Sequence, residues 1–90
     1  MTEFFGFLRH SINVNKLTKI DLEFGKALRK KRLLRKLTQE ALSSASDLSR
    51  AYISELEMGH MDPSLYTLFK LSKALKINIR NLIHDFDVHI

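Results

Sequence analysis

A helix-capping pattern that occurs twice in close succession constrains this chain more than any other feature. In each copy a hydroxyl residue stands between a leucine and, four positions further on, an aliphatic residue: Leu37, Thr38 and Leu42, then Leu48, Ser49 and Ile53. The hydroxyl can accept a hydrogen bond from the first helical turn, and the two apolar residues can pack together as a hydrophobic staple. The pattern predicts two short helices with a tight turn between them at Asp47, a residue type that tolerates left-handed backbone.

A longer helix is predicted before this pair, over residues 18–35. Thr18 is expected to cap it, and Ile20, Phe24 and Leu28 then recur every four residues on one face. The next member of that stripe is Arg32, a charged residue that needs a partner if it lies against the core.

Two further helices are predicted after the pair. Gly59 is expected to end the second helix of the pair. Asp62 and Pro63 predict the start of a fourth helix, with aspartate as the cap and proline in the first position. Asn78 is expected to cap a fifth. The apolar residues of these two helices are Leu65, Leu68, Leu71 and Leu75, then Ile79, Leu82, Ile83 and Phe86.

The composition fits one small all-α domain. The 90 residues are 44% hydrophobic and include one proline and three glycines, which permits helices and disfavours a β fold with many turns. We expect residues 18–90 to form a five-helix domain. Residues 1–17 are expected to form a short N-terminal arm, whose apolar residues are Phe4, Phe5, Phe7 and Leu8.

Positive charge is concentrated in the first part of the chain. Of the net charge of +5, residues 1–36 contribute ten basic and three acidic side chains, or +7, and residues 37–90 contribute five and seven, or −2. A basic segment attracts polyanions, although charge alone does not distinguish DNA from RNA or an acidic membrane surface.

Several classes of protein are disfavoured by what the sequence lacks. It has no cysteine, no signal-peptide pattern and no apolar run near the roughly 20 residues that span a bilayer. His84, Asp85, Asp87 and His89 match no familiar metal-site spacing and predict a polar tail. No nucleophile stands with a histidine and a carboxylate in a recognisable arrangement. We therefore expect a cytoplasmic protein that is not an enzyme and uses no cofactor.

The second helix of the capped pair has an outer face suited to close approach. Counted from the cap, its outward positions are Arg50, Ala51, Ser54, Glu55 and Met58, and only Met58 is large and apolar. Short side chains with a few hydrogen-bonding groups let a helix approach base edges in the major groove of DNA.

These features together resemble the phage repressor and Cro family of helix-turn-helix proteins. The resemblance covers about residues 22–86 and is carried by three segments in register, 37–42, 49–59 and 63–68. It implies a five-helix, repressor-like domain that binds double-stranded DNA at a palindromic operator, usually as a dimer. It also implies that Arg32 in the first helix pairs with Glu57 in the recognition helix.

The residues that we expect to contact DNA lie on both helices of the pair: Thr38, Gln39, Ser49, Arg50, Ala51, Tyr52, Ser54 and Glu55. Tyr52 can instead pack against the fourth helix. Glu55 can accept a hydrogen bond from a cytosine amino group or restrain Arg50. Arg35 or Lys36 is expected to touch phosphate, and the other basic residues of the first helix to act only at long range.

The leading interpretation is a transcriptional repressor that acts as a homodimer. We expect its interface to centre on the fifth helix, at Leu82, Ile83 and Phe86. An alternative is an antitoxin that holds a toxin protein through its apolar arm and regulates its own operon. Membrane attachment through the arm is disfavoured, because the apolar face of the arm is short.

Overall fold

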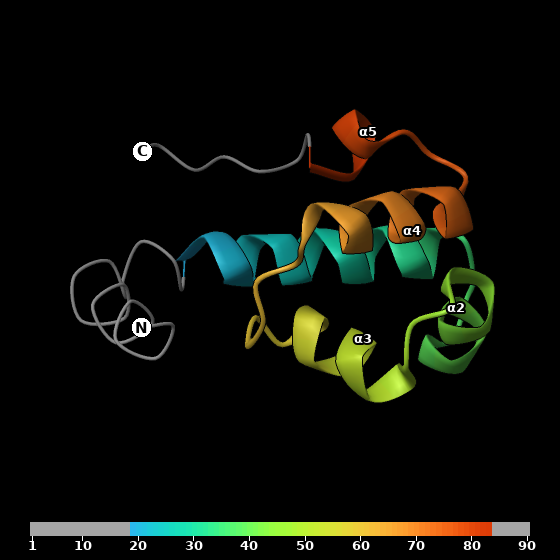
Figure 1. The fold of residues 1–90 in the computed structure, drawn as a ribbon, viewed down its shortest axis with the longest axis horizontal. Helices are drawn as coiled ribbons and strands as arrows, with labels where there is room; N and C mark the ends of the chain where they lie inside the picture. The colour runs from blue at the N-terminus through green and yellow to red at the C-terminus, as the bar shows by residue number, and fades with distance from the viewer. Residues whose placement is uncertain (1–18, 84–90) are drawn as a thin grey trace.

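The computed structural model describes residues 19–83, and every regular element in that range is an α-helix (Figure 1). The first helix covers residues 19–34, and it is followed by α2 (Gln39–Ser46), α3 (Arg50–Glu57), α4 (Leu65–Leu75) and α5 (Ile79–Ile83). In Figure 1, α4 runs alongside the first helix, with α2 and α3 on one side of these two helices and α5 on the other. The all-α, five-helix prediction is confirmed, whereas the arm, Thr18 and Phe86 lie outside the described residues.

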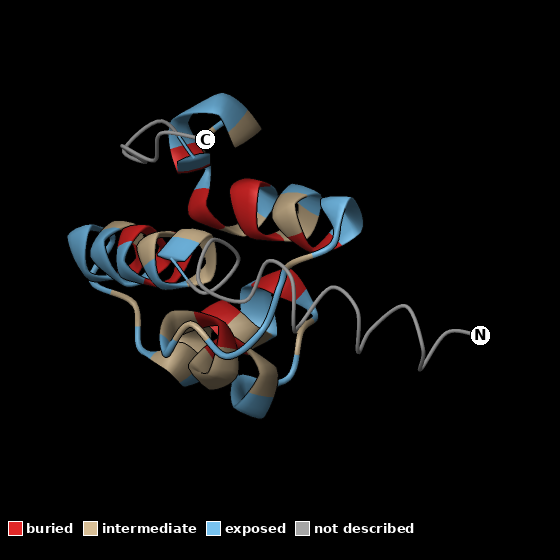
Figure 2. Ribbon diagram, turned by 90° about the vertical axis from the view of Figure 1, so that its left-hand side faces the viewer, coloured by how far each residue is buried: buried red, intermediate tan, exposed pale blue. Residues whose placement is uncertain are grey.

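Side chains from all five helices meet in one core. Figure 2 shows the buried residues, in red, on the sides of the helices that face one another. The core consists of Phe24, Leu28, Leu42, Ile53, Leu56, Leu71, Leu75 and Leu82. Complete burial of one such side chain contributes about 1.5–3 kcal/mol. The predicted stripe on the first helix is confirmed at Phe24 and Leu28, and its continuation, Arg32, is 8% exposed.

The two predicted caps are present. The Thr38 hydroxyl accepts a hydrogen bond from the N–H of Ala41, and the Ser49 hydroxyl accepts one from the N–H of Tyr52, each at 3.0 Å. Leu37 and Leu48, the leucines before the caps, both pack against the core. The short range of these interactions explains why sequence alone located both helices.

Three helices end at a residue that has left-handed backbone and is not glycine. Lys36 follows the first helix with φ of 58°, Asp47 ends α2 with φ of 60°, and Lys76 ends α4 with φ of 58°. At Asp47 this agrees with the turn predicted there, because α2 ends at Ser46. Gly59, just after α3, has φ of 78°, consistent with its predicted role as a stop.

The predicted start of α4 was wrong by two residues. Ser64, not Asp62, is the cap, because its hydroxyl accepts the hydrogen bond from the N–H of Thr67 at 3.0 Å. Pro63 therefore precedes the helix rather than occupying its first position. The α5 cap is as predicted, since the Asn78 side chain accepts a hydrogen bond from the N–H of Asn81 at 2.9 Å.

Candidate nucleic-acid interface

α3 has one face in the core and the opposite face open. Ile53 and Leu56 are completely buried. Arg50 and Ala51 are exposed, and Ser54 and Glu55 are partly exposed. Within residues 19–83, the Arg50 guanidinium forms no hydrogen bond or ion pair, so it is free to bind a ligand. The helix therefore presents short and hydrogen-bonding side chains around one unpaired cation.

A buried ion pair holds α3 from behind. Arg32 donates from Nε to Glu57 Oε2 at 2.6 Å and from Nη2 to Glu57 Oε1 at 2.9 Å. Its third donor, Nη1, reaches the carbonyl of Leu37 at 2.8 Å, just before α2. The hydrogen bonds to Glu57 hold the pKa of Arg32 above its usual value, so the guanidinium stays charged. One side chain thus links the first helix, the start of α2 and the end of α3.

Gln39, in the first turn of α2, joins the same network. Its amide Nε2 donates to Glu57 Oε1 at 3.1 Å. The amide oxygen and the backbone N–H of Gln39 remain available at the open end of α2 to form hydrogen bonds with another molecule. The Thr38 and Ser49 hydroxyls accept hydrogen bonds as caps and keep their own protons to donate outward.

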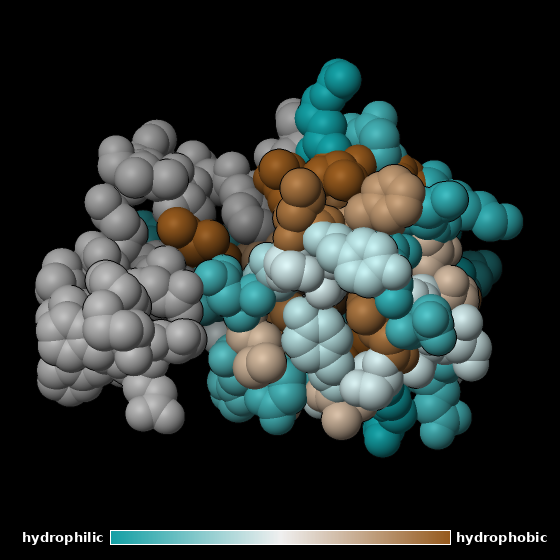
Figure 3. Space-filling model, viewed as in Figure 1, coloured by the Kyte–Doolittle hydropathy of each residue, from teal (hydrophilic) through white to brown (hydrophobic). Residues whose placement is uncertain are grey.

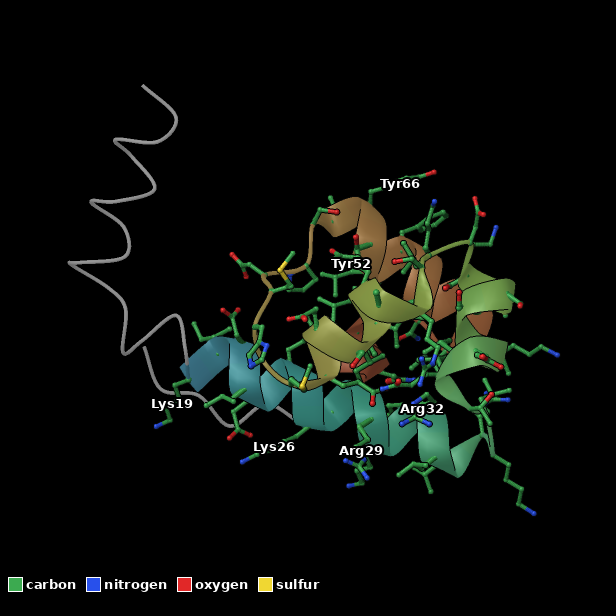
Figure 4. The ribbon with its side chains drawn as sticks, turned by 90° about the horizontal axis from the view of Figure 1, so that it is seen from below. Lys19, Lys26, Arg29, Arg32, Tyr52 and Tyr66 are labelled. Carbon is green, nitrogen blue, oxygen red and sulfur yellow. The ribbon has the colours of Figure 1, made fainter. Side chains whose placement is uncertain are left out.

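Tyr52 packs against α4, which is one of the two roles predicted for it. Its hydroxyl lies 3.1 Å from the hydroxyl of Thr67, which also accepts a hydrogen bond from Ser64 at 3.0 Å. In Figure 4, Tyr52 and Tyr66 lie on the side of the molecule opposite Lys19, Lys26 and Arg29. Lys26 and Arg29 therefore lie away from Tyr52.

Glu55 pairs with a residue that the sequence did not suggest. Its Oε2 lies 2.8 Å from His60 Nδ1, and no contact with Arg50 is formed. The sequence signal for this pair is weak, since it consists of a histidine placed just after the glycine that ends α3.

Arg35 likewise has a partner within the fold. It donates to the carbonyl of Lys76 at 3.1 Å, which ties the end of the first helix to the end of α4. The contact engages one nitrogen of the Arg35 guanidinium, whereas the neighbouring Lys36 is exposed.

Comparisons with known proteins agree with this geometry. The helix-turn-helix family model matches residues 28–82, a range that contains the whole of α2, α3 and α4. The chain belongs to the helix-turn-helix family.

This helix-turn-helix protein is similar in sequence to two curated proteins and in structure to a third protein. Control protein C.BamHI of Bacillus amyloliquefaciens is 41% identical over 68 residues, which are 74% of this chain and 83% of the control protein. The immunity repressor protein of Bacillus phage phi105 is 40% identical over 60 residues, which are 67% of this chain and 40% of the repressor. The restriction-modification controller protein C.AhdI from Aeromonas hydrophila matches with a TM-score of 0.68 and 39% identity, covering 69% of this chain and 94% of C.AhdI.

The protein is therefore a DNA-binding transcriptional regulator of the phage repressor and Cro type, in a family of regulators rather than enzymes. No helix within residues 19–83 is long and apolar enough to cross a membrane.

The surface of this helix-turn-helix protein corrects one part of the predicted dimer interface. Leu82 is completely buried under α4 and offers no surface to a partner. Ile83 is 40% exposed, whereas Phe86 lies outside residues 19–83. The exposed apolar residues of α4 are Leu65, Tyr66 and Phe69, and apolar side chains (brown) gather over α4 and α5 in Figure 3. Leu65 was predicted to belong to the apolar face of this helix, but it is exposed, and the buried residues of α4 begin at Thr67.

Proposed function

We propose that this regulator is a repressor that binds a palindromic operator as a dimer, with α3 in the major groove. The observation that carries the proposal is the orientation of α3. Its inner face is fixed by Ile53, Leu56 and the Arg32–Glu57 pair, while Arg50 stands on the open face without a partner in residues 19–83. A free arginine at the start of a recognition helix can donate two hydrogen bonds to O6 and N7 of guanine, or it can bind phosphate.

The start of α2 supplies the contacts that set the position of the domain on DNA. Thr38, Gln39 and Ser49 carry donors at the open ends of α2 and α3, and such contacts to phosphate are independent of base sequence. Ala51 and Ser54 remain candidates for contacts to base edges, because their short side chains let the helix backbone approach the groove.

A dimer would supply the second half of the interface with DNA. One domain of this size makes few base contacts, and two recognition helices about 34 Å apart can occupy successive major grooves. We place the contact between copies on the exposed apolar residues of α4 and on Ile83 of α5. In Figure 1, α5 lies on the opposite side of α4 and the first helix from α3, so association centred on α5 would leave both recognition helices free.

The alternative role as an antitoxin rests on the apolar arm, which lies outside residues 19–83. The relatives named as control proteins and as an immunity repressor favour control of transcription instead. Restriction–modification control and prophage repression are both compatible with these relatives.

Selection of bound sequences from random DNA, followed by mobility-shift titration, tests the proposal. We expect Arg50→Ala to weaken specific binding by about 1–3 kcal/mol and to relax the preference at one position in each half-site. Gln39→Ala should weaken binding to all sequences more evenly. Arg80→Ala is the matched control, because Arg80 is an exposed arginine on α5. A parent protein that enriches no sequence, or an Arg50 variant that binds like the parent, would contradict the proposal.

A further inference from the structure

The chain reverses direction just after α3 and brings His60 back over the recognition helix. Met58 ends the helix, and Gly59 follows with φ of 78°. The N–H of His60 then donates to the carbonyl of Glu55 at 3.0 Å, while the His60 ring reaches the Glu55 carboxylate at 2.8 Å. Two hydrogen bonds, one from the backbone and one from the side chain, therefore join the same two residues.

The turn that places His60 is tied to the first helix. A Cβ atom added at Gly59 would lie 2.6 Å from Cδ2 of Leu22 and 3.0 Å from its Cα. The close approach leaves little room for a side chain, and the positive φ adds backbone strain for any residue other than glycine. The position of the His60 backbone is thus set by the packing of the first helix against the end of α3.

The chemistry of the pair leaves one carboxylate oxygen for an outside donor. An ionised carboxylate only accepts hydrogen bonds, so Nδ1–H of His60 must be the donor. It occupies Oε2 of Glu55, and within the described part of the chain Oε1 has no hydrogen-bond partner. The Glu55 side chain is 45% exposed and lies one turn along α3 from Ala51, on the outer face.

A carboxylate on the outer face of α3 can contact a base only if its repulsion from phosphate is offset. Phosphates repel it, but a carboxylate can accept a hydrogen bond from the amino group of cytosine in the major groove. The N–H of His60 offsets part of the repulsion and limits the orientations of the carboxylate. Histidine suits this task because ordering its short side chain costs less conformational entropy than ordering lysine or arginine.

We infer that His60 is a specificity-determining residue of the DNA interface, which acts by holding the Glu55 carboxylate where a base amino group, most simply that of cytosine, can donate to it. The inference rests on the proposed placement of α3 in the major groove. It assigns His60 a positioning role, because an exposed side-chain pair of this kind contributes little to folding stability.

The test compares base preference rather than affinity alone. Sequences are selected from random DNA with the parent, His60→Ala, Glu55→Ala and the double variant, and the enriched operators are then titrated by mobility shift. We expect the parent to prefer one base pair at a position in each half-site by roughly 5- to 150-fold, with cytosine as the contacted base. Glu55→Ala should abolish that preference, and His60→Ala should reduce it several-fold. His60→Ala should have no further effect when Glu55 is already alanine.

Met61→Ala is the matched control, because Met61 is the exposed neighbour of His60 in the same loop. Thermal unfolding of each variant checks the fold, and His60→Gln, which retains an N–H donor, should keep part of the preference. A His60→Ala variant that is folded and keeps the parent preference at every position would overturn the inference. Arg50→Ala is selected and titrated in parallel; if it still loses its own preference while His60→Ala does not, the proposed function stands and only the role of His60 fails.

Discussion

The most informative perturbation is the removal of Arg32 from its pair with Glu57. The two side chains are 9% and 5% exposed, and Arg32 makes three hydrogen bonds, two to Glu57 and one to the carbonyl of Leu37. Arg32→Met would leave a buried carboxylate whose only remaining hydrogen bond within residues 19–83 is the one from Gln39. Removing one partner of such a pair typically costs about 3–5 kcal/mol.

This loss is large for a small domain, whose total stability is typically about 5–15 kcal/mol. At roughly 4–8 °C per kcal/mol, the midpoint of thermal unfolding should fall by at least about 12 °C. The raised pKa of Arg32 also predicts how the loss depends on pH. A group whose pKa is raised by folding stabilises the folded state fully at pH values below its unfolded pKa. This contribution is lost only as the pH rises from the unfolded pKa through the folded pKa. The contribution of the Arg32 charge should therefore be constant across the neutral range.

Urea unfolding followed by circular dichroism measures the effect in a double-mutant cycle with Glu57→Leu. The double variant should recover much of the stability lost in either single variant, because an apolar pair in place of a buried ion pair is often neutral. Arg29→Met is the control, since Arg29 is an exposed arginine on the same helix. Arg32→Met with a loss below about 1 kcal/mol, or a cycle without coupling, would refute the argument from burial.

Three other substitutions have defined outcomes. Ser49→Ala removes the cap of α3 and should lower the free energy of unfolding by about 0.5–2 kcal/mol in urea titrations, with Ser44→Ala as an exposed comparison. Gly59→Ala combines positive φ with a clash against Leu22 and should cost more than about 1 kcal/mol; an unchanged unfolding midpoint would show that the turn can relax. Phe69→Asp should give a folded monomer in sedimentation equilibrium, whereas Leu82→Asp should unfold the domain, because only Leu82 lies in the core. If the Phe69→Asp variant is folded and still dimeric, the dimer interface does not include this surface of α4.

The sequence was most informative where an interaction spans only a few residues. The caps at Thr38, Ser49 and Asn78 each join a side chain to an N–H three residues on, so a local pattern was enough to find them. The start of α4 was harder because Asp62 and Ser64 are both good caps. In the structure Ser64 is the cap. Its hydroxyl also donates a hydrogen bond to the Thr67 hydroxyl, which lies within hydrogen-bond distance of the Tyr52 hydroxyl.

Contacts between distant segments were beyond the reach of local patterns. The bond from Arg35 to Lys76 depends on how the first helix and α4 end side by side. The contact of His60 with Glu55 depends on a chain reversal whose direction is set by Leu22, far away in sequence. Leu82 and Ile83 are adjacent apolar residues, and only the placement of α5 decides which of them is buried.

The three left-handed helix ends at Lys36, Asp47 and Lys76 have a consequence for how this domain can evolve. Left-handed backbone costs a residue other than glycine roughly 1–2 kcal/mol. Substitution of any of these three residues by glycine could therefore increase the stability of the folded domain. Lys36 and Lys76 carry the full backbone cost, whereas aspartate tolerates this conformation, so a glycine at Asp47 would gain mainly by removing a negative charge from the negative end of α2. Acquiring such a glycine would let the domain tolerate destabilising substitutions on the outer face of α3. The recognition surface could then change toward a new operator while the scaffold remained folded.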